Sequence, residues 1–439
     1  MTNPELLQLL RSEVIPAIGC TEPIAVALCT ARAKELLGAE PDSITVHLSK
    51  NVYKNALAVG IPNTGMTGLP IAIALGATVG KSEYMLEVLR DATPEAVAYA
   101  KAYMLRVPAT IKVDYEAPSL LYIHVEVSSN GQTAQATIMD EHTHFVEPGT
   151  RKQESISIGE IETKENTLSL RRVYDFAASV DTTELTFLLE GAEMNTAAAE
   201  TSFANQYGHG LGRLLRPIPN SAASNSPQDV QYPIGGTPSA LSLFGNTLFT
   251  KIISYTCGAC DARMSGAMVQ VMSNSGSGNQ GISCSIPVYL YAKENNCTEE
   301  QTLRALALSN LTVIYIKQSL GRLSALCGCV VAATGSAAGI TYLMGGTYDE
   351  ITYAIKNMIA NISGMICDGA KPGCALKVTS GVATAIFSAY LAMQHYYADS
   401  TEGIVEDDID RTIRNLTRIG HDGMKVTDDL ILDIMTHKQ

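Results

Sequence analysis

The sequence predicts an α+β fold in which a mixed N-terminal unit, residues 1–165, precedes a large and mostly helical unit, residues 166–439. Two observations carry this prediction. Before residue 165, several short runs alternate apolar and polar residues, a pattern typical of strands. From Thr167 onward this alternation stops, and Ala-, Leu- and Ile-rich stretches with helical spacing alternate with glycine-rich breaks as far as Gln439. We expect the boundary in the charged stretch 164–166.

The N-terminal unit is expected to mix helices and strands along the chain. Helices are predicted over residues 5–14 and 23–38, and Pro23 is favourable in the first turn of the second. The remaining helices are predicted over 66–75 and 82–103, and the strands over 43–48, 109–116, 121–128, 133–139 and 155–161. Asn130-Gly131 should close a hairpin between two of these strands, because both residues tolerate positive φ.

Composition narrows the class of protein. An apolar share of 46% supports a sizeable core, and a net charge of −13 without any dense Lys/Arg run argues against nucleic-acid binding. The N-terminal residues lack the features of a signal peptide, so a cytoplasmic protein with reduced cysteines is expected. Residues 323–348 and 378–397 are long and uncharged, but their small residues and the absence of Trp favour buried helices over membrane spans.

Three cysteines near the end of the chain suggest an iron–sulfur site. Cys367 and Cys374 bracket a segment with Gly369, Pro372 and Gly373, which prevents a continuous helix and allows both sulfurs to converge. Cys327 or Cys329 would complete the set. Residues that are two positions apart on a helix point to different faces, so only one of these two cysteines should be a ligand, and the spacing does not favour either of them. Three thiolates leave one iron free to act as a Lewis acid. The competing interpretation is that these cysteines simply fill the core.

Cys20 is the most informative N-terminal cysteine. In Gly19-Cys20-Thr21-Glu22-Pro23 it lies just before a predicted helix, whose positive end should favour a thiolate. Such a thiolate could remove a proton, attack an electrophile or bind the open iron. A buried small residue is the alternative. Cys29 and Cys284 are interpreted as core residues, and the Cys257/Cys260 pair lacks the second pair that a structural zinc site needs.

Three polar segments are candidates for substrate binding. Residues 50–55 lead into the Gly/Thr loop 60–68, whose backbone N–H groups could hold a carboxylate, although a plain turn is the alternative. The loop 273–281 is polar between apolar flanks, which favours a site over a surface linker. His142 and His144 are interpreted as a polar edge or a secondary substrate contact, and Asp261 and Arg263 as a structural ion pair.

These motifs together resemble the L-cysteine desulfidase family, which is related to the iron–sulfur L-serine dehydratases. The resemblance rests on 19–23, Lys54-Asn55 with the following loop, 277–281 and 367–374, and covers almost the whole chain. It implies a [4Fe–4S] cluster held by Cys327, Cys367 and Cys374, and it selects Cys327 over Cys329. It further implies Cys20 as the catalytic base and substrate contacts from Asn51, Lys54, Asn55, Thr64, Ser277, Asn279 and Lys371.

The implied reaction is elimination of sulfide from L-cysteine, giving pyruvate and ammonia without pyridoxal phosphate. The closer spacing of the last two cysteines and the replacement of a Ser-His-Thr loop weaken, without excluding, the alternative of L-serine or another β-substituted amino acid. A cluster-sensing protein and a transporter are the alternatives from other classes. The expected partners are an amino-acid substrate and a second copy of the chain, with neither nucleic acid nor membrane.

Overall fold

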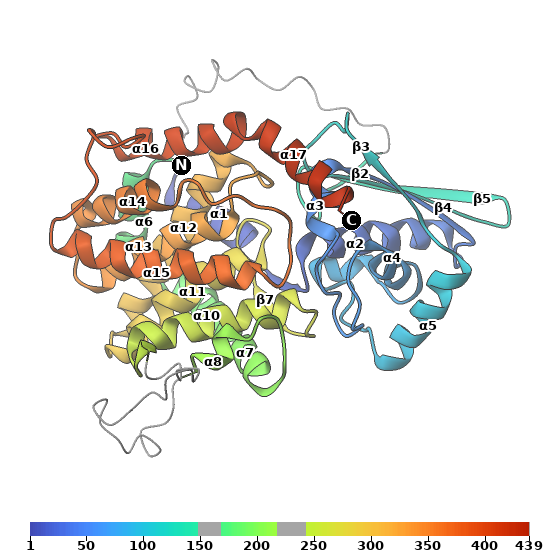
Figure 1. Ribbon diagram of the computed structural model, residues 1–439, viewed down its shortest axis with the longest axis horizontal. Helices are drawn as coiled ribbons and strands as arrows, with labels where there is room; N and C mark the ends of the chain where they lie inside the picture. Colours follow the sequence, from blue (N-terminus) through green and yellow to red (C-terminus); the bar gives the residue numbers. More distant parts are fainter. Residues whose placement is uncertain (148–167, 217–242, 439) are drawn as a thin grey trace, which may run out of the picture.

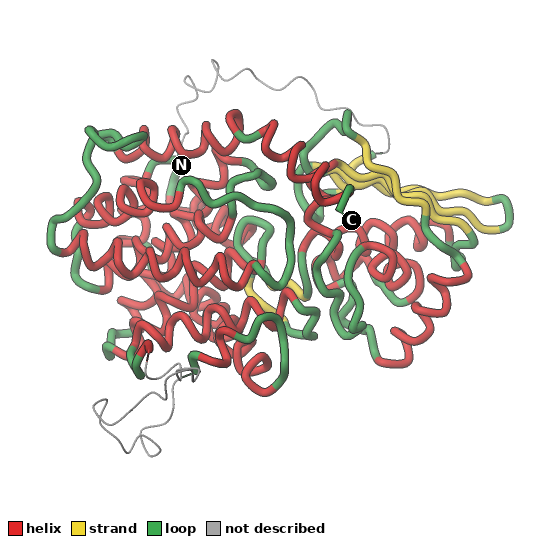
Figure 2. The backbone as a smooth tube through the Cα atoms, in the orientation of Figure 1, coloured by secondary structure: helices red, strands yellow, loops and turns green. Residues whose placement is uncertain are grey.

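The computed structural model describes residues 1–147, 168–216 and 243–438, which form two lobes (Figure 1). One lobe is mixed and contains a sheet, and the other is built almost entirely from helices, so the chain is mostly helical and α+β overall. The predicted strand 155–161 and the predicted boundary 164–166 lie outside the described residues. Figure 2 shows the strands gathered at one side of the smaller lobe, apart from a short pair between the lobes.

The sheet of the mixed lobe has the order β3-β2-β4-β5-β6, parallel only between β2 and β3. Its strands are β2 Ser43–Ser49, β3 Thr110–Asp114, β4 Tyr122–Ser129, β5 Gln132–Met139 and β6 Phe145–Val146. The hairpin between β4 and β5 turns at Asn130 and Gly131, both at positive φ, which confirms that prediction. Alternate residues of β4 face a core shared with the buried helix α2 (Thr21–Leu37).

Two features of the mixed lobe differ from the sequence expectations. The helix predicted over 82–103 is two elements, a 3₁₀ helix η1 Ser82–Glu87 and α5 Pro94–Arg106. Thr93 caps α5 by accepting from the Ala96 amide, and Pro94 occupies its first position, so a new helix begins there. Residues 50–55, expected to lead into a loop, form the helix α3 Lys50–Ala56 directly after β2. The remaining helix is α4 Leu69–Thr78.

The larger lobe packs its helices in layers around α12 and α13, which are buried along most of their length (Figure 1). Its elements are α6 Leu170–Ser179, η3 Thr182–Leu185, α7 Thr186–Ala204, α8 Leu211–Leu214, α10 Leu248–Met264, α11 Gly278–Glu294, α12 Glu299–Leu320, α13 Gly328–Leu343, α14 Tyr348–Ile362, α15 Cys374–Met393, α16 Ile409–Arg418 and η6 Ile419–Gly423. The uncharged stretch 323–348 contains α13, a buried helix as expected.

The helix α15 differs from α13 in having an exposed face. Phe387 and Tyr390 are 55% and 61% exposed on it. Among the described helices, α15 is the one whose length and composition would allow it to cross a membrane. Of its most apolar 18-residue stretch, 44% is buried in the helical lobe.

Both ends of the described chain pack on the other lobe. Leu6 and Leu10 of α1 (Asn3–Glu13) are fully buried in the core of the helical lobe. The strand β1, Pro16–Ile18, pairs antiparallel with β7, Gln270–Met272, and so joins the lobes. At the other end, α17 (Lys425–Thr436) leaves the helical lobe and lies beside α3 of the mixed lobe (Figure 1). The region between the lobes is therefore built from segments far apart in sequence.

Candidate functional site

Cys327 and Cys367 lie on two short extended segments that pair between the lobes. Leu326 and Ile366 form an antiparallel bridge, flanked by hydrogen bonds from Cys327 N to Met365 O (2.9 Å) and from Cys367 N to Ala325 O (2.7 Å). Because side chains alternate along an extended chain, Cys327 and Cys367 both point to the face opposite Leu326 and Ile366. Such diagonal neighbours are about 7–8 Å apart between Cα atoms.

Cys374 reaches the same region through the turn that follows Cys367. Asp368 accepts from both Lys371 (2.5 Å) and Lys377, and these two cations lower the pKa of its carboxyl to about 2 against the opposing effect of burial. Gly369 takes a positive φ of 86° in this turn, and Cys374 begins α15. The break predicted at Gly369, Pro372 and Gly373 is therefore present. Lys371, predicted to bind substrate, donates to Asp368 and to the Gly369 carbonyl within the turn.

Cys327 and Cys329 interact with each other. The Cys329 thiol interacts with the Cys327 sulfur and, with the amides of Cys329 and Val330, lowers the pKa of Cys327 despite burial. The same contact raises the pKa of Cys329. Burial raises the pKa of Cys374, and it raises that of Cys367 to about 11. The two thiols thus form one interacting pair at the start of α13, and the choice of Cys327 rests on the resemblance.

The chemistry around these cysteines suits an iron–sulfur cluster. Within 1–147, 168–216 and 243–438, no three His, Cys, Asp or Glu side chains are gathered for a single metal ion. A cluster is wider than one ion, and its thiolates stand farther apart. The cations Lys54, Lys317 and Lys377 lie close enough to Cys327 or Cys367 to affect their ionisation, so they would offset the negative charge of thiolates. The three cysteines therefore fit the group.

Cys20 lies at the start of α2, as predicted, but its expected activation is absent. It is 3% exposed, and burial together with the Glu22 carboxylate raises its pKa well above the ordinary value, opposite to the direction expected from the helix end. Its thiol donates to Glu22 Oε2 at 3.2 Å, while Asn55 Nδ2 donates to Glu22 Oε1 at 3.0 Å. Cys20 is thus a neutral thiol held against a buried carboxylate, and that carboxylate is its available proton acceptor.

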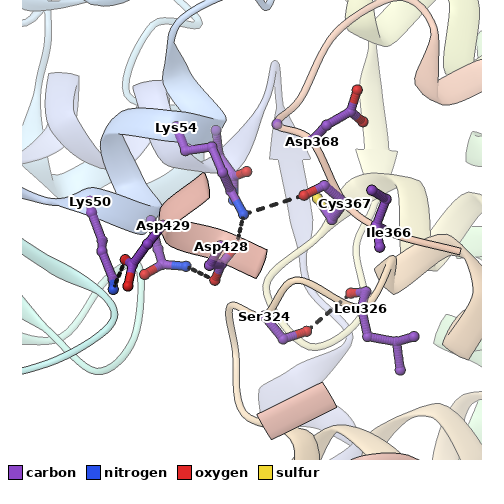
Figure 3. A network of polar contacts seen from close by, with 12 residues as sticks. Lys50, Lys54, Ser324, Leu326, Ile366, Cys367, Asp368, Asp428 and Asp429 are labelled. Carbon is purple, nitrogen blue, oxygen red and sulfur yellow. Dashed lines mark hydrogen bonds and ion pairs between the residues drawn. The ribbon is translucent and has the colours of Figure 1, made fainter. Parts of the chain in front are cut away.

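Two of the predicted substrate residues of α3, Asn51 and Lys54, contact α17, and Figure 3 shows Lys54 directed toward Asp428. Lys54 pairs with the Asp428 carboxylate and donates to the Cys367 carbonyl (3.4 Å), and Asn51 Nδ2 donates to Asp428 at 2.6 Å. Lys50 pairs with Asp429 on the outer side. The side-chain oxygens of Asn51 and Asn55 are buried without a hydrogen-bond partner. The helix α3 therefore holds the Cys367 segment to the mixed lobe and leaves two acceptors unused.

The Gly/Thr loop 60–68 does not offer the anion cradle that was expected. Amides of Gly60 and Asn63 donate to the carbonyls of Met264 and Gly266, both at 3.0 Å, which joins the loop to the end of α10. The Thr64 hydroxyl donates to Ile61 O and accepts from the Met66 amide. The loop thus joins the two lobes. The contact of Thr64 with substrate stays a prediction, because the Thr64 hydroxyl already makes hydrogen bonds within the loop.

The polar loop 273–281 is buried between the lobes, as its apolar flanks indicated. Ser273 and Ser275 anchor it to the chain around β1, and Ser277 precedes α11 without capping it. Asn279 accepts from Arg263 Nη1 at 3.0 Å. The prediction of an ion pair between Arg263 and Asp261 is wrong, because residues that are two positions apart on α10 point to different faces. Asp261 instead accepts from the His209 amide, and burial raises its pKa to about 6.

Comparison with known proteins identifies the family. A family model described as serine dehydratase alpha chain matches residues 83–433, about four-fifths of the chain. The chain belongs to the serine dehydratase alpha chain family. It is also 55% identical over 440 residues to a UPF0597 protein of Phocaeicola vulgatus, covering 99% of this chain and 98% of that protein. UPF0597 proteins of Oleidesulfovibrio alaskensis and Shewanella pealeana are 41% and 40% identical, each over at least 99% of both chains.

Membership supports the broader kinship inferred from the motifs. Proteins of the serine dehydratase alpha family typically depend on an iron–sulfur cluster, and the matched segment includes Cys327, Cys367 and Cys374. Cys20 and α3 lie before that segment. The narrower resemblance to L-cysteine desulfidases stays a prediction.

Sequence reasoning undervalued His142 as a member of this site. The imidazole is 5% exposed, its Nε2 is buried without a partner, and Glu22, Arg322, Lys317 and Arg263 are all near enough to affect its ionisation. Burial lowers its pKa to about 4, so it is neutral at pH 7. The Glu141-His142-Thr143-His144 run follows a strand without a third ligand, and nothing in the sequence separates the buried His142 from the exposed His144.

Proposed function

We propose that this chain is a [4Fe–4S] lyase that converts L-cysteine to pyruvate, ammonia and hydrogen sulfide by α,β-elimination, without pyridoxal phosphate. The observation that carries this proposal is the convergence of Cys327, Cys367 and Cys374 beside the buried Cys20–Glu22 pair. Bound by these three thiolates, the cluster would supply an open iron as a Lewis acid for the departing sulfur.

The residues of the chain account for the proton transfers. The α-proton of the substrate is removed by Cys20 or by the adjacent Glu22 carboxylate, which accepts the 3.2 Å hydrogen bond from the Cys20 thiol. The C–H electron pair becomes the new double bond, and the C–S pair leaves with sulfide. The product, 2-aminoacrylate, tautomerises and is hydrolysed by water to pyruvate and ammonia. Asn55 holds Glu22 in place through its 3.0 Å hydrogen bond.

The test is anaerobic purification followed by iron analysis and assay of sulfide and pyruvate from L-cysteine. Cys367→Ser should lose bound iron and turnover, whereas Cys297→Ser, at a cysteine outside the site, should keep both. Cys20→Ala should retain iron and lose turnover, which also separates a lyase from a cluster sensor. Full activity in metal-free protein would overturn the proposal.

A second candidate is the same elimination on L-serine, and the family match favours it. The two are separated by comparing kcat/KM for L-cysteine, L-serine and other β-substituted amino acids on one preparation. A higher value for L-serine would reassign the substrate and leave the roles of Cys327, Cys367, Cys374 and Cys20 unchanged.

A further inference from the structure

Arg263 is a buried cation with two nitrogen atoms that make no hydrogen bond. It lies at the end of α10, is 1% exposed, and donates only through Nη1, to Asn279 Oδ1. Its Nε and Nη2 atoms are buried without a hydrogen-bond partner, and no Asp or Glu of the described residues lies within ion-pair distance. Leaving a buried charge unpaired costs several kcal/mol, so proteins rarely do so without a ligand.

The unpaired atoms form a fork with a defined shape. Nε and Nη2 lie on the same edge of the guanidinium plane, and together they match the two oxygens of a carboxylate. Gly278 lies directly against this group, because a Cβ at that position would overlap Nε and come within 2.7 Å of Cζ. A glycine is therefore needed where the 273–281 loop passes the guanidinium.

The surroundings of the fork favour an anion as well. Gly278 begins α11, and Ser277 provides no side-chain cap for the first-turn amides, so they add positive potential beside Arg263. Gln280 Oε1 is buried without a partner in the same turn and could accept from an ammonium group. One turn thus offers positive potential for a carboxylate and an acceptor for an amine.

The fork is also close to the proposed chemistry. The positive charge of Arg263 is near enough to Cys20 to oppose the effect of Glu22 on the ionisation of that thiol. A carboxylate bound at Arg263 would therefore lie in the same region of the protein as the Cys20–Glu22 pair. The same cation influences His142 on the opposite lobe.

We propose that Arg263 binds the α-carboxylate of an L-amino acid through Nε and Nη2, as a positioning residue for the elimination. This assignment rests on the proposed function for its choice of ligand. It makes a free α-carboxylate the feature that the site requires, whichever group leaves from the β-carbon. The ligands that fit are small α-amino acids, and their amides and decarboxylated analogues do not.

The binding test uses L-alanine, which has no leaving group, and L-alaninamide, which lacks the carboxylate. Anaerobically purified protein with its natural metal content is titrated with each, followed by NMR. The natural chain should bind L-alanine and discriminate against L-alaninamide, and Arg263→Gln should weaken L-alanine binding by roughly 10- to 100-fold. Arg263→Lys keeps the charge without the fork, and it should also bind L-alanine more weakly.

Three results would overturn the assignment. They are unchanged L-alanine binding in Arg263→Gln, equal binding of L-alanine and L-alaninamide by the natural chain, and equal binding of acetate and L-alanine, which would indicate a general anion site. Arg263 makes one hydrogen bond to the protein, so Arg263→Gln should fold, and retained iron together with an unchanged circular dichroism spectrum would verify this.

Turnover provides the second readout and separates this inference from the proposed function. If L-cysteine is turned over, Arg263→Lys should raise KM more than it lowers kcat, whereas loss of structure would lower activity together with iron content. If no sulfide is released by the natural protein, the proposed function fails, and the L-alanine titration still decides the role of Arg263.

Discussion

Replacing His142 with glutamine should remove a specific part of the pH dependence of stability. The pKa of His142 is about 4 in the folded protein, mainly because of burial, and about 6.5 in an unfolded chain. Between these values the unfolded chain binds more protons at this position, so folding becomes less favourable as the pH falls from about 6.5 toward 4. Above pH 7 the imidazole is neutral in both states and contributes nothing.

The size of the effect follows from the two pKa values. At pH 5 nearly all unfolded molecules but only about one folded molecule in ten carry the proton on His142, which lowers the free energy of unfolding by about 2 kcal/mol relative to pH 7.5. Asp261, whose pKa is raised to about 6, acts in the opposite direction. Because Asp261 is present in every variant, its contribution cancels when the variants are compared.

The measurement is urea unfolding at pH 7.5 and pH 5 in reducing buffer, followed by far-UV circular dichroism because the chain has no Trp. His142→Gln should lose about 2 kcal/mol less stability on acidification than the natural chain. The exposed His144→Gln is the matched control and should behave like the natural chain. A difference below about 0.5 kcal/mol between His142→Gln and the control would refute the reasoning.

Three further predictions concern the junction of the lobes and the assembly of the chain. Asp428→Asn breaks the buried ion pair with Lys54 and should lower the free energy of unfolding by about 3–5 kcal/mol in the same urea titration. Asp429→Asn, which breaks a surface ion pair, should lower it by about 1 kcal/mol or less. Equal effects of the two substitutions would contradict the distinction between the buried and the surface pair. Gly60→Ala places a Cβ 2.5 Å from the Gly266 amide nitrogen and should cost about 1–3 kcal/mol, while Gly364→Ala, with open space around it, should be nearly neutral in thermal melts. Light scattering should give a mass of two or more chains, because a second copy of the chain is an expected partner, and a single-chain mass would contradict that expectation.

Local patterns predicted four of the five strands of the sheet, β2 to β5. The Asn130-Gly131 turn and the alternation of β4 depend on neighbours in sequence, so they are readable from it. The helix α3 was missed because it is short and follows β2 without a turn residue. The break before α5 was readable, since Thr93-Pro94 is a helix start that the apolar periodicity of 82–103 obscured.

The missing parts of the site depend on long-range contacts. Asp428 meets Lys54 across 374 positions, and no local pattern connects an acidic residue of a C-terminal helix with a lysine near the N-terminus. The sequence suggested an ion pair between Arg263 and Asp261 because the two are close in sequence, whereas in the structure two nitrogen atoms of Arg263 have no hydrogen-bond partner. Buried polar groups without a hydrogen-bond partner can be found only once the packing is known.

The location of α1 in the helical lobe has a consequence for biosynthesis. Leu6 and Leu10 emerge early from the ribosome, but their core includes residues of α12, which ends at Leu320. At roughly 5–20 residues per second, these leucines wait about 15–60 s for their packing partners. During that interval an amphipathic segment remains uncovered on a nascent chain, and exposed apolar surface of this kind promotes aggregation. A fragment restricted to the mixed lobe would keep that exposure permanently.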